Sequence, residues 1–171
     1  QGRNNMNKFS IFFVLLIVAS NTFGAEKGEL LSGFSMGVGS ESSPTLISLN
    51  YENYSGCMAI GQGILENNRV FVEINTLACS SEHYHKEFSV AQGVVLDQRG
   101  EMGLSAKHIP ASDELIEAVE IPEKLFAQIG NKESLAYIQE AKMGHWDVEK
   151  GIEVQVLFKE APKLVSKIPI N

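Results

Sequence analysis

The sequence predicts a mainly β fold, a β-barrel or sandwich of short antiparallel strands with a short α-helical insert before the closing strands. Residues 69–77 alternate between apolar and polar side chains, which is typical of a strand with one buried face. Between 112 and 143 the apolar residues recur at helical spacing instead. Strand alternation returns at 152–158. Several short strands of this kind favour a closed barrel or two packed sheets.

The N-terminal region matches a secretory signal peptide at residues 6–24. A short basic start at Met6 precedes an apolar run that extends from Phe9 to Ala19. That run is too short for a helix across a bilayer, which needs about 20 residues. Small residues follow, and we expect cleavage after Gly24. An uncleaved membrane anchor is the alternative.

The rest of the chain fits one domain, because 171 residues are an ordinary domain length. We expect residues 1–5 to be artificial or upstream additions, since a natural start follows them. We expect a single β-barrel domain over 25–160, with the helical insert at 112–143. The Pro-containing segment 161–171 is expected to be a flexible tail.

The chain is acidic, with 14 basic and 21 acidic residues and a net charge of −7. Loss of residues 1–24 would remove Arg3 and Lys8 and bring the net charge to −9. Such a surface is poorly suited to contacts with nucleic-acid phosphates or anionic lipid. It is compatible with a basic protein partner.

Turn signals separate the expected strands. Asn67 and Asn68 tolerate positive φ and therefore predict a turn before the strand at 69–77. Gly93 predicts a β-bulge or a close backbone approach. A hairpin is expected across Asp97–Gly100. The other expected strands are at 45–49, 57–61, 88–96, 102–107 and 146–148, and Trp146 is expected to anchor the core.

The insert is expected to contain three short helices. Ser112 is a good N-cap for the first, and acidic residues follow it in the first turn. Pro122 is expected to end that helix and to begin the next, which runs to Gly130. A third helix is predicted from Lys132 or Glu133 to Met143.

Cys57 and Cys79 are expected to form a disulfide, because export would place them in an oxidising compartment. Closing a loop of this length would stabilise the fold by about 3 kcal/mol. Two buried free thiols are one alternative. A zinc site with His83 and His85 is another, although the spacing matches no standard ligand pattern.

No motif in the chain predicts catalysis. There is no nucleophile elbow or phosphate-binding loop, so no catalytic residue, cofactor or metal is expected and the protein is predicted not to be an enzyme. A hydrolase that uses a serine or a carboxylate with a shifted pKa remains the third hypothesis for function.

The helical insert carries an apolar stripe that could pack on the barrel, meet a neighbouring subunit or enter a membrane. Its many carboxylates make membrane entry costly, by about 2.5–3.5 kcal/mol each. We therefore expect protein packing, with the helices at 112–129 and the loop at 37–44 as contact elements. The candidate subunit interface comprises Leu115, Ile116, Val119, Leu125, Phe126 and Ile129.

A series of short motifs resembles a known family. In order, they are LLSG, PTLISL, Cys57-x3-Gly61-x-Gly63, RVFV, Leu77-x-Cys79, GVVLDQRGEMGL and YIQEAKMGHWDVEKGIEVQVLF. This ordered series, which covers most of the chain after the signal peptide, resembles the C-terminal barrel domain of TraB/TrbI-like scaffold proteins. These proteins belong to the outer-membrane core complex of conjugative type IV secretion systems.

The resemblance implies a structural subunit that forms or lines an oligomeric ring in the periplasm, close to the outer membrane. Its partners would be other copies of the same chain, a secretion-system lipoprotein and a second β-rich ring protein, with no direct nucleic-acid binding. The chain departs from the family in having a signal peptide where the family has a cytoplasmic tail, an inner-membrane helix and a Pro-rich spacer. The competing hypothesis is a monomeric periplasmic β-sandwich that acts as a binding or inhibitor module.

Overall fold

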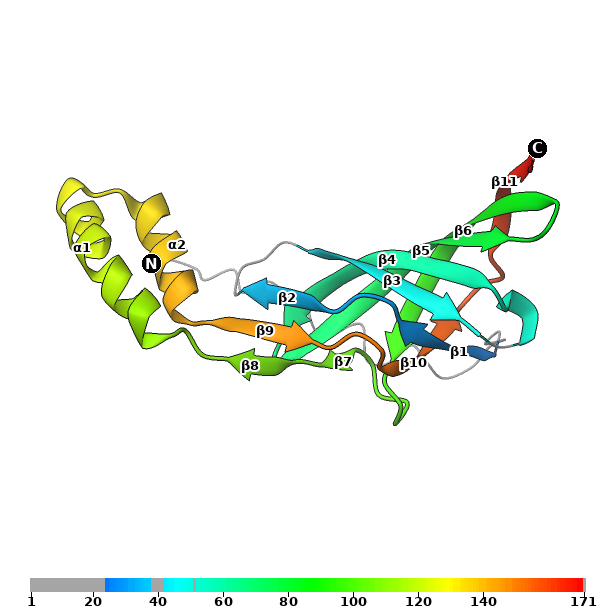
Figure 1. Cartoon of the computed structure of the whole chain (residues 1–171), viewed down its shortest axis with the longest axis horizontal. Helices are drawn as coiled ribbons and strands as arrows, with labels where there is room; N and C mark the ends of the chain where they lie inside the picture. Colours follow the sequence, from blue (N-terminus) through cyan, green and yellow to red (C-terminus); the bar gives the residue numbers. More distant parts are fainter. Residues whose placement is uncertain (1–23, 38–41, 51, 171) are drawn as a thin grey trace, which may run out of the picture.

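The computed structural model describes residues 24–37, 42–50 and 52–170. Its centre is a closed antiparallel barrel of six strands, as the sequence predicts (Figure 1). Around the barrel, each strand pairs with the next in the order β1, β3, β4, β5, β6 and β10, and β10 pairs with β1 to close it. These strands are β1 (Ala25–Leu30), β3 (Ser43–Leu49), β4 (Cys57–Glu66), β5 (Arg69–Ser80), β6 (Tyr84–Leu96) and β10 (Glu153–Phe158).

The remaining elements lie outside the closed barrel. Strands β2 (Phe34–Gly37), β9 (His145–Val148) and β8 (Lys107–Ile109) form a three-stranded ribbon. This ribbon leads to two helices, α1 (Asp113–Ile129) and α2 (Lys132–Lys142), which form a hairpin at one end of the molecule (Figure 1). Short strand β7 (Leu104–Ser105) pairs with β5, β11 (Lys163–Pro169) pairs with β6, and a 3₁₀ turn covers Glu52–Tyr54.

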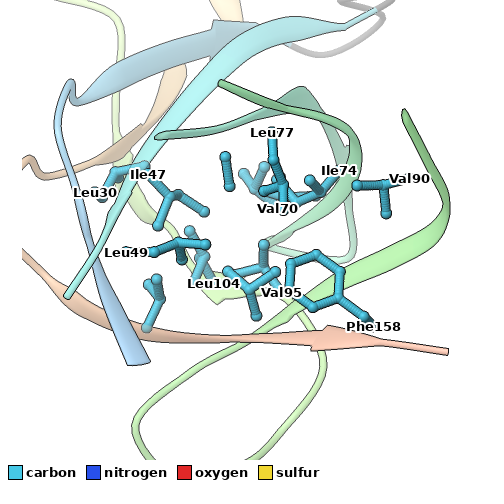
Figure 2. Close-up of a cluster of buried hydrophobic side chains, with 14 of the residues drawn as sticks. Leu30, Ile47, Leu49, Val70, Ile74, Leu77, Val90, Val95, Leu104 and Phe158 are labelled. Atoms are coloured by element: carbon cyan, nitrogen blue, oxygen red, sulfur yellow. The ribbon is translucent and has the colours of Figure 1, made fainter. Parts of the chain in front are cut away.

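The barrel interior is filled mainly by aliphatic side chains and one phenylalanine, and among the described residues Glu26 and Thr45 are also buried. Alternate residues of each strand point inward, so every strand contributes one face to a common, largely apolar core. The side chains in Figure 2 converge on this interior. The fully buried set includes Leu30, Ile47, Leu49, Val70, Ile74, Leu77, Leu104, Val154, Val156 and Phe158.

A β-bulge changes which face of β5 is buried. The sequence alternation places Thr76 on the same face as Val70, Val72 and Ile74, but Thr76 is only half-buried and Leu77 is fully buried instead. The pairing with β4 skips Asn75, so β5 has one extra residue there. Because the side-chain period is two, one extra residue moves every later inward position by one.

Gly93 marks the close backbone approach that the sequence predicts. A Cβ at this position would lie 2.9 Å from Ile74 Cβ and 2.9 Å from Val90 Cγ1. The β5–β6 pairing also shifts register between Ile74 and Thr76. The absence of a side chain at Gly93 therefore lets β5 and β6 remain paired through an irregular section of the barrel wall.

Three expectations need correction. Pro122 does not separate two helices, because α1 runs continuously through it. The turn at Asp97–Gly100 is present, but the ladder expected after it is limited to one bridge, between Leu96 and Met102. The strand that follows, β7, pairs with β5 and not with β6. The segment expected to be a flexible tail contains β11, whose backbone pairs with β6.

Other local expectations are confirmed. Asn67 and Asn68 have φ values of 51° and 62° in the turn between β4 and β5. The side-chain oxygen of Ser112 caps α1 by accepting a 3.2 Å hydrogen bond from the Leu115 N–H. Gly130 ends α1 with φ of 71°. Residues 1–23, which hold the expected additions and all of the expected signal peptide at 6–24 except Gly24, lie outside the described residues.

We predict that Gly93→Ala lowers the free energy of unfolding by about 1–3 kcal/mol, because the added methyl group overpacks the contact with Ile74. Chemical denaturation measures the effect. Ser89→Ala, an exposed change on the same strand, is the control and should stay within about 0.5 kcal/mol of the wild type. Equal effects of the two changes would contradict the role assigned to Gly93.

Candidate interaction surfaces

Cys57 and Cys79 form the predicted disulfide, with an S–S distance of 2.03 Å. The two residues are directly opposite each other on β4 and β5, and both contact the barrel core. The bond locks the β4–β5 pair at the end away from its Asn67–Asn68 turn. Neither sulfur is then available as a thiolate, so the zinc alternative at Cys79, His83 and His85 loses its cysteine ligand.

We predict that the Cys57→Ala/Cys79→Ala double variant loses about 3 kcal/mol of stability, because its unfolded chain is no longer cross-linked over a separation of 22 residues. Denaturation with and without a reducing agent measures the loss. The reducing agent should destabilise the wild type and leave the double variant unchanged. A wild type that is insensitive to complete reduction would contradict this contribution.

Arg69 is the first residue of β5, and its side chain organises the turn at Asp97–Gly100. Its guanidinium donates to Asp97 Oδ2 at 2.9 Å and to the carbonyl oxygens of Met102 at 3.0 Å and Gly103 at 2.8 Å. Glu101 Oε2 lies 3.4 Å from the same group. The sequence alone could not identify these partners, which lie about thirty residues away in the chain.

The hydrogen bond from Arg69 lowers the pKa of Asp97 below its usual value, against an opposing effect of burial. Backbone N–H groups of Glu101 and Arg99 lower it further. The ionised carboxylate is therefore favoured in the folded state. Its contribution to stability is present above the pKa of Asp97 in the unfolded chain and is lost as the pH falls through the lowered folded pKa.

We predict that Asp97→Asn makes stability less dependent on pH in this acidic range, because the titrating group has been removed. Urea denaturation at a series of pH values measures the slope. Gln98→Ala, an exposed change of a residue that does not titrate in the same turn, is the control and should keep the wild-type slope in that range. An unchanged slope in Asp97→Asn would contradict the assignment to this carboxylate.

Trp146 lies in the three-stranded ribbon and not in the barrel core. Its ring is half-buried and lies 4.5 Å, between centroids, from that of His108. Its Nε1–H donates to Asn68 Oδ1 at 2.7 Å, and His108 Nε2 lies 2.8 Å from the carbonyl oxygen of Met143. These contacts fix the ribbon to the β4–β5 turn and to the end of α2, so Trp146 has a positioning role.

The helical hairpin is held together by its own contacts. Glu123 accepts a 3.1 Å hydrogen bond from Gln139 and pairs with Lys142 at 2.8 Å. Glu123 therefore marks the side of α1 that faces α2. Val119 and Phe126 lie on this side at helical spacing and are partly buried, yet α1 contains no fully buried residue.

A second side of α1 is apolar and exposed. Ile121, Leu125 and Ile129 are spaced four residues apart and are 77%, 52% and 64% exposed. We call these three residues the α1 stripe. The helix as a whole is acidic, with Asp113 and four glutamates against the single Lys124, although Glu120 pairs with Lys124 and Glu123 with Lys142.

The six residues predicted as a subunit interface do not all lie on the same side of α1. Leu125 and Ile129 belong to the α1 stripe, and Leu115 and Ile116 are about 40% exposed. Val119 and Phe126 lie on the side that faces α2. Sequence reasoning missed Ile121, because Pro122 was expected to end the helix there. The other expected contact element, the loop at 37–44, lies partly outside the described residues.

A groove of about 460 Å³ lies on the outer face of the barrel wall. It spans strands β4, β5, β6 and β11, and its lining includes Ile60, Ala78, His85, Glu87, Ser166 and Ile168. We call it the outer groove. The Ser80 hydroxyl lies 2.8 Å from His85 Nδ1 beside it.

A second hollow, of about 350 Å³, lies near the start of β1 and is lined by Glu26, Asn53, Tyr54 and Phe158. Burial, and then the charge of Glu26, raise the pKa of Tyr54, so its hydroxyl stays protonated over a wider pH range. The ring of Tyr54 contacts that of Phe158 edge to face at 5.6 Å. Trp146 does not line this hollow.

Within the described ranges, no helix is both long and apolar enough to cross a membrane. The same residues contain no group of three or more histidine, cysteine, aspartate and glutamate side chains placed to hold a metal ion. No protein-family model matches the chain, and no curated protein matches it either.

Proposed function

We propose that the protein is a non-enzymatic structural subunit of an oligomeric periplasmic assembly, of the type found in the outer-membrane core of conjugative type IV secretion systems. The observation that carries this proposal is the exposed apolar stripe on a helical hairpin that lies outside the barrel (Figure 1). A helix with three large apolar side chains in water is costly unless another surface covers them.

The order of the elements supports the same function. The TraB/TrbI-like barrel domain, which the sequence resembles, has its insert before the closing strands. Here α1 and α2 are inserted between β8 and β9, and β9 is followed by the closing strand β10. In this proposal the barrel is the body of one subunit in a ring, and its partners are further copies, a secretion-system lipoprotein and a second β-rich ring protein.

The test is the mass of the native complex that contains this chain after extraction from the source cell with mild detergent. A megadalton-scale assembly that also contains a lipoprotein and a second β-rich protein would support the secretion-core function. A free soluble monomer would refute it and would favour the monomeric binding module, for which the hollow beside Glu26 and Tyr54 is the candidate ligand site.

We predict that Leu125→Asp shifts the chain from the large assembly to a free form while leaving monomer stability within about 0.5 kcal/mol of the wild type, because this residue is 52% exposed. Native mass and thermal denaturation measure the two effects. Phe126→Asp is the contrasting variant, since it should also destabilise the α1–α2 hairpin. Parallel loss of stability and assembly in Leu125→Asp would contradict a role of this residue in an interface.

A further inference from the structure

The hollow near the start of β1 lies at one end of the barrel interior, and we call it the β1 hollow. Glu26 occupies an inward position on β1, opposite Val156 of the closing strand β10, and is 6% exposed. Phe158 is the last residue of β10 and belongs to the barrel core (Figure 2). The β1 hollow is therefore at a mouth of the barrel, which is a common position for ligand sites.

The lining residues differ in exposure from the rim of the β1 hollow to its floor. Gly24 and Asn53 are exposed, Tyr54 is half-buried, and Glu26 and Phe158 are buried. A ligand that enters from solvent would therefore reach the carboxylate of Glu26 only at the floor. The volume of about 350 Å³ is near the lower end for ligand pockets, so the hollow suits a small molecule or the end of one side chain.

The charges at the β1 hollow favour a cation. Its ionisable groups are the carboxylate of Glu26 and the phenol of Tyr54, and none of the described lining residues is basic. The negative charge of Glu26 contributes, after burial, to the raised pKa of Tyr54, so the carboxylate acts on the same space as the phenol. The net charge of −7 also attracts positive ligands. A neutral apolar ligand would remove water from the carboxylate, which costs free energy.

The acceptor groups suit a primary ammonium better than a metal ion. Within the part of the chain that the structure describes, no three acidic, histidine or cysteine side chains are placed to hold a metal. A primary ammonium has three N–H donors, and the side chains of Glu26, Asn53 and Tyr54 offer acceptor oxygens at the hollow. A carboxylate has about four acceptor positions, so Glu26 can accept from a ligand in addition to its contacts within the chain.

Two aromatic rings add a second preference for a cation with an alkyl chain. Tyr54 and Phe158 contact edge to face, with 5.6 Å between centroids and 68° between the ring planes. They therefore form two walls of different orientation. The π surface of an aromatic ring attracts a cation, and the same ring provides apolar contact for an alkyl chain.

We propose that the β1 hollow binds a primary alkylammonium group, with the ammonium at Glu26 and the alkyl chain against Tyr54 and Phe158. Two sources supply this chemistry, a free small amine and the lysine side chain of a partner protein. The inference goes beyond the proposed function, because a structural subunit of a ring needs no ligand in its barrel.

Titration of the full chain, which retains Gly24, with n-butylammonium chloride tests the site by NMR at constant ionic strength. The backbone amide signals of Glu26, Tyr54 and Phe158 should shift and reach saturation. n-Butanol has the same carbon chain without the charge and should bind about tenfold more weakly, because it loses the charge-assisted hydrogen bonds. Equal binding of the two probes would contradict recognition of the charge.

Three variants test the residues. Glu26→Gln removes the charge with little change of shape and should weaken binding of n-butylammonium about tenfold. Tyr54→Leu removes one ring and should weaken it about fivefold. Glu29→Gln, an exposed change on the same strand and outside the hollow, is the matched control and should bind like the wild type. If circular dichroism shows that Glu26→Gln does not fold, the comparison of n-butylammonium with n-butanol on the wild type decides.

Nα-acetyl-lysinamide separates the two sources of the ammonium group. Binding at least as tight as that of n-butylammonium indicates the lysine side chain of a partner, whereas weaker binding indicates a free small amine. The proposal is overturned if neither ammonium probe shifts the signals of the hollow, or if folded Glu26→Gln binds as tightly as the wild type. The proposed function would stand in either case, because these measurements follow a ligand and not assembly.

Discussion

Closure of the barrel by β6 is the constraint on which the rest of the structure depends. One edge of β6 pairs with β5 along most of its length, while the other edge pairs first with β11 and then with β10. A single long strand therefore joins the first half of the barrel to its C-terminal strands. The apolar faces of all six strands meet in one interior only when these pairings are made.

The irregularities in the barrel wall follow from this geometry. A closed wall of few strands must curve sharply, and bulges and glycines are where strands bend. Asn75 is the extra residue on β5, and Gly93 faces the same region from β6. The disulfide fixes β4 to β5 further along the same pair, so the irregular section lies within a well-connected part of the wall.

Local chemistry made much of this fold predictable from sequence. Strand alternation, the asparagine turn, the Ser112 cap and the paired cysteines each depend on residues close to the element they define. The failures came from interactions between distant residues. The bulge at Asn75 is a property of how β4, β5 and β6 fit together, and the pairing of β11 with β6 joins segments that no local pattern connects. The prediction that Pro122 ends a helix failed for a related reason. Contacts between α1 and α2 can outweigh the local preference of a proline.

For the candidate surfaces, sequence indicated the apolar residues of α1 but not their division into two sides. Only the pairing of Glu123 with α2 shows which side is covered within the chain. The outer groove had no sequence signal, because it is assembled from four strands and its residues are individually ordinary. Surfaces built across strands are in general harder to predict than stripes along one helix.

The pairing of the first barrel strand with the last has a consequence for when the protein can acquire its structure. Glu29 of β1 pairs with Glu153 of β10, so one edge of β1 stays unpaired in a growing chain until β10 has emerged, although β3 can pair with its other edge earlier. Until then β1 and β6 expose backbone edges that could pair with other chains. A chain of this topology therefore has an extended vulnerable period during synthesis, in which a holding chaperone would protect it, and slow completion follows from such distant contacts.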